Sequence, residues 1–161
     1  MVASIFFLMV FFVIELGLVF AAQNGLVDSV RNAARRAATY RINEQSFDST
    51  VWNQICTTIA EELDTQLGDD RTGIVGFNQV NRTRVIAYEW QESSVSGKYF
   101  LVASVSATYH NPLHVPIVSA ILDASDGAVD GGLRLSASEK MRVENPALEY
   151  ASSPTTPPTC P

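Results

Sequence analysis

The sequence lacks the residues on which most catalytic and nucleic-acid-binding sites depend. No lysine or arginine precedes Arg31, and the 161 residues include only two histidines and two cysteines. Acids outnumber bases by 17 to 11, and this balance argues against nucleic acid as a partner, because phosphate backbones are bound by basic surfaces. CxxC, GxSxG, P-loop and dinucleotide-binding motifs are absent. We therefore expect no enzyme, no cofactor and no small-molecule substrate.

Two groups of residues were considered as metal ligands. His110 and His114 are four residues apart, but Pro112 lies between them and excludes a regular helix, and no Cys or Glu stands nearby at ligand spacing. The Asp and Gly residues of 123–132 do not have the spacing of an EF-hand loop. We predict ordinary loop histidines and a solvated turn, and no metal site.

The longest hydrophobic run lies at the start of the sequence. Residues 1–22 are apolar or small except for Ser4 and one acid, Glu15. Because about 20 apolar residues cross the hydrocarbon core of a bilayer, this run predicts a membrane-spanning helix. A cleaved signal peptide is the alternative, but it requires a basic region before the apolar one, and residues 19–21 form only a passable cleavage site.

The helical pattern continues beyond the apolar run. Residues 23–42 are rich in Ala and Arg and keep helical spacing, so we predict one transmembrane and assembly helix over residues 1–42. At 1.5 Å per residue such a helix is roughly 60 Å long. Since this length exceeds a bilayer, half of the helix must stand in water or among other helices.

Small residues recur at every fourth position along this helix. Small side chains at this spacing let helix backbones approach closely. Because the i+4 row drifts around a straight helix, the row predicts a winding contact with several neighbouring helices. Its six members are Gly17, Ala21, Gly25, Ser29, Ala33 and Ala37.

Glu15 is the second candidate for an assembly residue. An acid in hydrocarbon is costly and needs a partner. One interpretation is a tolerated acid near the outer leaflet. The interpretation that we favour is a register device, in which each subunit's Glu15 pairs with the N-terminal amine or an arginine of a neighbour.

Residues 43–150 are predicted to form one small α+β domain. Asp48 and Ser49 are candidate N-caps of a second helix, and Gly68 is a natural stop. The apolar face expected for this helix consists of Trp52, Ile55, Ile59, Leu63 and Leu67. Its acids, Glu61, Glu62 and Asp64, are expected to form a solvated face.

Four later segments carry strand signals. β-branched and aromatic residues, or alternation, predict strands over 73–80, 84–91, 98–109 and 132–143. The last two alternate between apolar and polar side chains, which implies an antiparallel sheet with one face packed on a helix. Residues 110–131 form a long excursion that is expected to be partly apolar and packed.

The two cysteines make one possible disulfide. Cys160 lies in a Pro- and Thr-rich tail, residues 151–161, and a bond to Cys56 would close a loop of about 100 residues, stabilising the fold by roughly 4 kcal/mol. A disulfide requires an oxidising compartment. The arginines of 31–41 follow the apolar run and would by the positive-inside rule place the domain in the cytoplasm. We give the disulfide more weight and expect the domain to be exported.

Two stretches of the sequence resemble the TadE-like pseudopilins of Tad (Flp-type) pilus systems. The first, FFVIELGLVFAAQNGLVDSVRNAARRAATY, contains an I-E-x-G motif at Ile14 to Gly17 and an N-A-A-R-x-A-A-like run at residues 32–38. The second, LRLSASEKMRVEN, is similar to a late strand of the family. The family usually has a glutamate near the start of the mature chain, where this sequence reads Met-Val-Ala-Ser.

The resemblance implies a bacterial subunit that is anchored in the inner membrane, exported and processed by a prepilin peptidase. It would then enter an extracellular pilus, which serves adhesion, as a minor pseudopilin or as the major subunit. Its partners would be further copies of itself or other pilins, through the N-terminal helix. The alternative is a single-span, membrane-anchored binding module that grips a glycan or a partner and does not polymerise.

Overall fold

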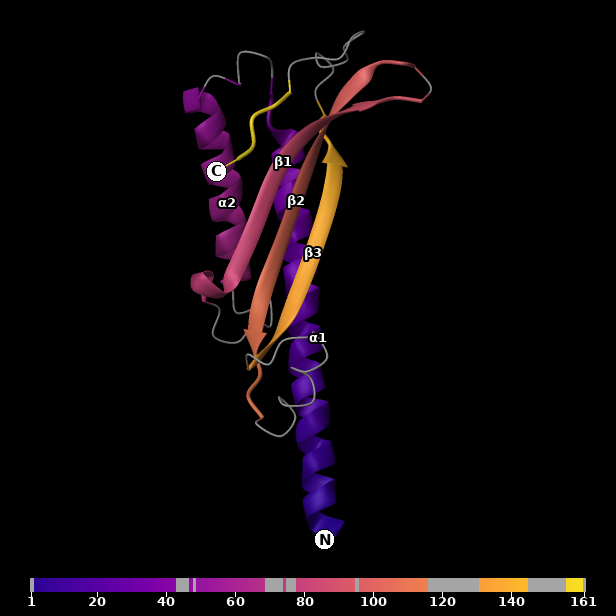
Figure 1. The fold of residues 1–161 in the computed structure, drawn as a ribbon, viewed down its shortest axis with the longest axis vertical. Coiled ribbons are helices and arrows are strands. Elements are labelled where there is room, and N and C mark those ends of the chain that lie inside the picture. The colour runs from indigo at the N-terminus through magenta and orange to yellow at the C-terminus, as the bar shows by residue number, and fades with distance from the viewer. Residues whose placement is uncertain are drawn as a thin grey trace.

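The described part of the chain folds into two helices packed on an antiparallel sheet. The computed structural model describes residues 2–42, 47, 49–68, 74, 78–94, 96–115, 131–144 and 156–160. The elements are α1 (Val2–Thr39), α2 (Ser49–Leu67), the 3-10 helix η3 (Gln79–Asn81), β1 (Arg82–Glu92), β2 (Tyr99–Pro112) and β3 (Gly132–Arg142). The predicted α+β class, with a long apolar helix, a second helix and an antiparallel sheet, is confirmed (Figure 1).

The first helix is continuous over 38 residues, or about 57 Å at 1.5 Å per residue. Figure 1 shows α1 (indigo) passing behind the sheet and projecting well beyond its lower end. The last turn of a helix leaves carbonyls without a helical partner. Here the Tyr88 hydroxyl donates to the Ala37 carbonyl at 3.1 Å, and the Glu144 amide donates to the Ala38 carbonyl at 3.1 Å. A residue of β1 and a residue just after β3 therefore supply hydrogen bonds to two carbonyls at the C-terminal end of α1.

The second helix agrees with the prediction. It spans Ser49–Leu67 and is followed by Gly68, whose amide donates to the Asp64 carbonyl at 3.0 Å. The five residues of the predicted apolar face, Trp52, Ile55, Ile59, Leu63 and Leu67, are all buried. The Trp52 ring contacts the Tyr88 ring edge-on, with centroids 5.2 Å apart, so α2 packs on β1.

The sheet has the order β1-β2-β3, with both pairs antiparallel. The alternation predicted for residues 98–109 is confirmed in β2, since Leu101, Ala103, Val105 and Ala107 on its inner face are buried. In β3 the alternation holds as well: Leu135 is buried, whereas Arg134 and Ser136 are exposed. Both helices cover the inner face, and they share one core cluster with it.

The strand prediction for residues 73–80 was wrong at its end. Residues 79 and 80 belong to η3 instead. The Asn78 side chain accepts a hydrogen bond from the Val80 amide at 3.0 Å and so caps this turn. Most of residues 73–77 and residues 116–130 of the predicted excursion lie outside the described residues.

Candidate functional site: the two surroundings of α1

The free end of α1 presents large apolar side chains to its surroundings. Ten of them are between 38% and 67% exposed. They are Ile5, Phe6, Phe7, Leu8, Met9, Val10, Phe11, Val13, Ile14 and Phe20. By length and composition, the helix over Ala3–Thr39 is able to cross a membrane. Because soluble proteins seldom expose so much contiguous apolar surface, this end of α1 requires lipid or other helices around it.

The remainder of α1 belongs to the core of the domain. From Ala22 onward, the residues that face the sheet and α2 are almost completely covered. Leu26, Ala33, Ala34 and Ala37 are each 0% exposed. The Gln23 side chain also donates to the Ser136 carbonyl at 3.0 Å, which ties α1 to β3. The predicted extension of the helix beyond the apolar run therefore serves the subunit's own fold.

The row of small residues is divided between these surroundings. Gly17 and Ala21 are exposed, whereas Gly25, Ser29, Ala33 and Ala37 are buried within the chain. Within the subunit only two of the six members are thus exposed, and the contact of this row with neighbouring helices stays a prediction. Small side chains allow close approach to any flat surface, and here the sheet and α2 occupy that space.

Glu15 lies where the covered part of α1 begins. It is 1% exposed, and its Oε1 accepts a hydrogen bond from the His114 amide at 2.9 Å. The His114 Nδ1 is 3.9 Å from the same oxygen. Among the described residues, Oε2 has no hydrogen-bond partner. Glu15 is therefore enclosed by its own subunit, and its pairing with a neighbour stays a prediction.

The predicted disulfide is present. Cys56, on the buried side of α2, is bonded to Cys160, with Cα atoms 5.4 Å apart and a sequence separation of 104. The bond holds residues 156–160 against α2 (yellow in Figure 1). Its presence in the fold fits a domain that matures in an oxidising compartment.

A charged cluster between α2 and β1 was missed from the sequence. Asp64, expected on a solvated face, accepts hydrogen bonds from both Arg82 and Arg84, and its side chain is only 13% exposed. The signal was available in the pattern of β1. Arg82 and Arg84 alternate in phase with the inward-facing Ile86 and Tyr88, so both arginines face inward and require an acid there.

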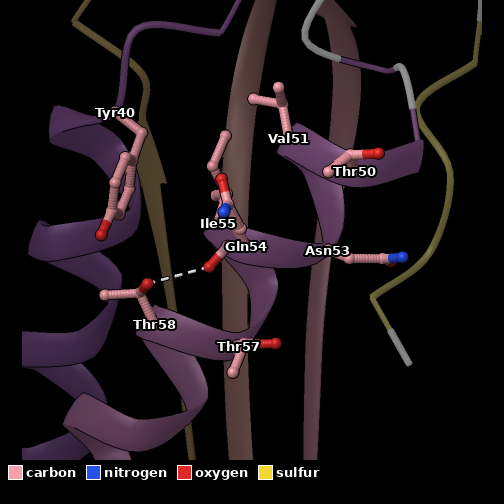
Figure 2. Close-up of a pocket in the computed structure, with 8 residues that line it drawn as sticks. All are labelled: Tyr40, Thr50, Val51, Asn53, Gln54, Ile55, Thr57 and Thr58. Carbon is pink, nitrogen blue, oxygen red and sulfur yellow. Dashed lines mark hydrogen bonds between the residues drawn. The ribbon is translucent and has the colours of Figure 1, made fainter.

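A groove lies between the end of α1 and the exposed side of α2. Its volume is about 740 Å³, and its lining is Tyr40, Thr50, Val51, Asn53, Gln54, Ile55, Thr57 and Thr58. Figure 2 shows Gln54 and Thr58 on the side of α2 toward Tyr40, with the Thr58 hydroxyl donating to the Gln54 carbonyl at 2.8 Å, whereas Asn53 and Thr57 point away from the Tyr40 ring. The lining contains no acid, base or cysteine, so the groove is suited to contact rather than to chemistry.

The two histidines that were considered as metal ligands have other surroundings. His114 lies beside Glu15. The His110 ring packs against Gly132 so closely that a Cβ added to this glycine would be only 2.5 Å from the ring. Among the described residues, no three His, Cys, Asp or Glu side chains are placed to hold a metal ion. The acids at 123–130 lie outside the described residues.

These features define a class of protein. A helix with a bare apolar end, followed by a small disulfide-bonded α+β domain, fits a membrane-anchored, pilin-like subunit. Residues 1–35 match the family model of TadE-like proteins, so the resemblance is confirmed over most of α1. The second stretch, in β3, lies outside that match and its resemblance stays a prediction. The comparisons with curated proteins and with solved structures found no match.

Proposed function

We propose that the chain is a structural subunit of an extracellular pilus or filament, anchored in the membrane by α1 until it is assembled. The observation that carries this proposal is the bare apolar end of α1, continuous with a helix that is otherwise packed into the domain. The match of residues 1–35 to TadE-like proteins supports the same role. The role requires binding surfaces and no catalysis.

In this proposal, the exposed apolar side chains at the free end of α1 are buried in two successive environments. Full burial of one large apolar side chain contributes roughly 1.5–3 kcal/mol, and ten such side chains are exposed here. Lipid supplies this burial before assembly. In a filament, the same side chains are buried by the α1 helices of neighbouring subunits, and packing between helices then replaces contact with lipid.

In this proposal, neighbouring helices pack closely at the exposed members of the small-residue row, Gly17 and Ala21. A Cβ placed on Gly17 meets no atom of its own subunit within 4 Å. Gly17→Leu with Ala21→Leu should therefore leave the monomer folded and anchored while blocking helix contacts. Val13→Leu, at a 67% exposed position, is the matched control because it also enlarges an apolar surface.

The direct test is electron microscopy of material sheared from intact cells, with mass spectrometry of the same fraction. Filaments dominated by this chain would identify a major subunit, and traces of it beside another pilin would identify a minor one. If the chain stays entirely in the membrane fraction, the filament proposal is wrong.

The second candidate function is a membrane-anchored binding module that does not polymerise. One observation favours it: four of the six small residues are used inside the subunit, and they are therefore not free for contacts between helices. The module would be indifferent to Gly17→Leu with Ala21→Leu. Loss of assembly in that double variant, with the Val13→Leu control unaffected, would exclude the module.

A further inference from the structure

The upper part of α1 and the neighbouring edge of the sheet form a basic flank. Arg31 and Arg35 lie on the exposed side of α1, and Arg142 is exposed at the end of β3. Arg35 and Arg142 line one depression of about 400 Å³, together with Ala38, Thr39, Met141 and Glu144. Arg31 makes only a long contact with Asp28, at 3.9 Å, and Arg35 has no ion pair among the described residues.

The exposed side of α2 has the opposite character. The helix contains no basic residue between Ser49 and Leu67. Glu61 and Glu62 are exposed, and the groove beside Tyr40 continues the same helix face toward its N-terminal end. Val51, 45% exposed, also lies in this groove. The acidic flank therefore carries its negative charge at Glu61 and Glu62, next to a groove whose Tyr40 ring centroid lies 5.7 Å from the guanidinium carbon of Arg36.

The two flanks lie on opposite sides of one subunit. α1 is packed between α2 and β3, with the Gln23–Ser136 hydrogen bond to β3 and the Glu144–Ala38 hydrogen bond to the residues just after it. In Figure 1, α2 stands on one side of α1 and β3 on the other. The basic flank of a chain thus does not reach its own acidic flank.

We propose that the basic flank formed by Arg31, Arg35 and Arg142 docks on the α2 flank of a second copy of this chain, with the arginines meeting Glu61 and Glu62. Complementary charge selects the partner and its register. Contact between two different surfaces of identical subunits is heterologous, and it propagates without closing when the rotation does not form a ring. The inference rests on the proposed function, and it assigns the lateral contact of the domains within that filament.

Charge reversal tests this pairing. Arg31→Glu with Arg35→Glu, and separately Glu61→Arg with Glu62→Arg, should each lower the amount of sheared filament by roughly tenfold or more, because like charges then face each other. The quadruple variant restores opposite charges and should recover filaments. Glu92→Arg with Ser94→Arg and Ser96→Arg is the matched control for Glu61→Arg with Glu62→Arg, since it adds the same positive charge at exposed positions outside both flanks. An intact Cys56–Cys160 bond, checked by mass, reports folding in every variant.

A photo-crosslinking amino acid at Thr57, in the groove, provides an independent readout. It should capture a peptide of residues 28–41 from another copy. Capture of a different protein would overturn the assignment of a second copy. Wild-type filaments combined with full assembly of both double variants, or a quadruple variant that is not restored, would overturn the pairing alone. If the wild type forms no filaments, the proposed function fails and the pairing fails with it.

Discussion

The lower half of α1, residues 2–21, and its upper half, residues 22–39, form one uninterrupted helix but have different surroundings. Leu8 is 41% exposed and is surrounded by other exposed apolar residues, whereas Leu26 is 0% exposed in the core of the domain. The same residue type on the same helix therefore contributes to different processes. In the upper half it stabilises the fold, whereas in the lower half it stays exposed on the surface of the subunit and is free to serve the proposed contacts with lipid or neighbouring helices.

The largest effect on stability is expected for loss of the disulfide, which lies in the domain that packs on the upper half of α1. Cys56→Ala with Cys160→Ala should lower the free energy of unfolding by about 4 kcal/mol, because a loop of 104 residues is no longer closed in the unfolded chain. Urea unfolding in detergent, followed by tryptophan fluorescence, measures this loss. Reduction of the wild type should reproduce it, and a loss below about 1 kcal/mol would contradict the entropic argument.

The comparison of the halves is tested directly by truncating one leucine in each. Leu26→Ala should lower the free energy of unfolding of the domain by about 3 kcal/mol through lost burial and a cavity. Leu8→Ala should leave it unchanged and should weaken retention in lipid vesicles. If both variants destabilise the domain equally in urea unfolding, the lower half is also part of the folded core.

Glu15, in the lower half, should have a smaller effect. Glu15→Leu leaves the His114 amide without its acceptor and should cost about 1–2 kcal/mol. Glu15→Gln retains an acceptor oxygen and should cost less. Hydrogen exchange at His114 is the specific readout, since its amide should exchange faster in Glu15→Leu than in Glu15→Gln. Equal exchange in the two variants would show that the contact does not protect this amide.

The smallest loss of stability at neutral pH is expected for Tyr88, which contacts the C-terminal end of α1. Tyr88→Phe removes the hydrogen bond to the Ala37 carbonyl and should cost about 1 kcal/mol. Its ring contact with Trp52 is retained, so core packing should not change. Urea unfolding at pH 7 measures the difference between the variant and the wild type.

The stability of the wild type and that of Tyr88→Phe should depend differently on alkaline pH. Burial, and to a smaller extent Tyr40, raises the pKa of Tyr88 above its ordinary value of 10.0. Above this pH the unfolded tyrosine loses its proton while the folded one keeps it, so the wild type loses stability as pH rises, by up to about 1.4 kcal/mol per pH unit. Tyr88→Phe lacks this contribution, and its deficit should shrink between pH 10 and 11. Parallel pH dependences would contradict the assignment.

The periodicity of the sequence was enough to predict α2 and the antiparallel sheet. The presence of only two cysteines was enough to predict the disulfide. The face from Trp52 to Leu67 and the alternation of β3 each follow from one element's own periodicity. The partners of Glu15 and Asp64 could not be read in this way. Glu15 meets a residue 99 positions away, and Asp64 meets two arginines on a strand whose packing side depends on the complete fold.

The small-residue row shows a different limit of sequence reasoning. Gly25 and Ala33 would suit a neighbouring helix or an intramolecular sheet equally well, because both surfaces require only the absence of a bulky side chain. The sequence establishes that something approaches α1 closely there. Which surface does so is decided by the complete chain, which supplies the sheet and α2 as the nearest apolar surfaces.

The hydrogen bond between Gln23 and Ser136 has a consequence for the timing of folding. Its two ends are 113 residues apart, so the upper half of α1 emerges from the ribosome long before β3, the strand that covers it. Contacts between distant residues form late, because the intervening loop must first be closed. Newly made chains therefore pass through an interval in which Leu26 and Val30 are uncovered. During that interval the nascent domain is most vulnerable to aggregation and proteolysis.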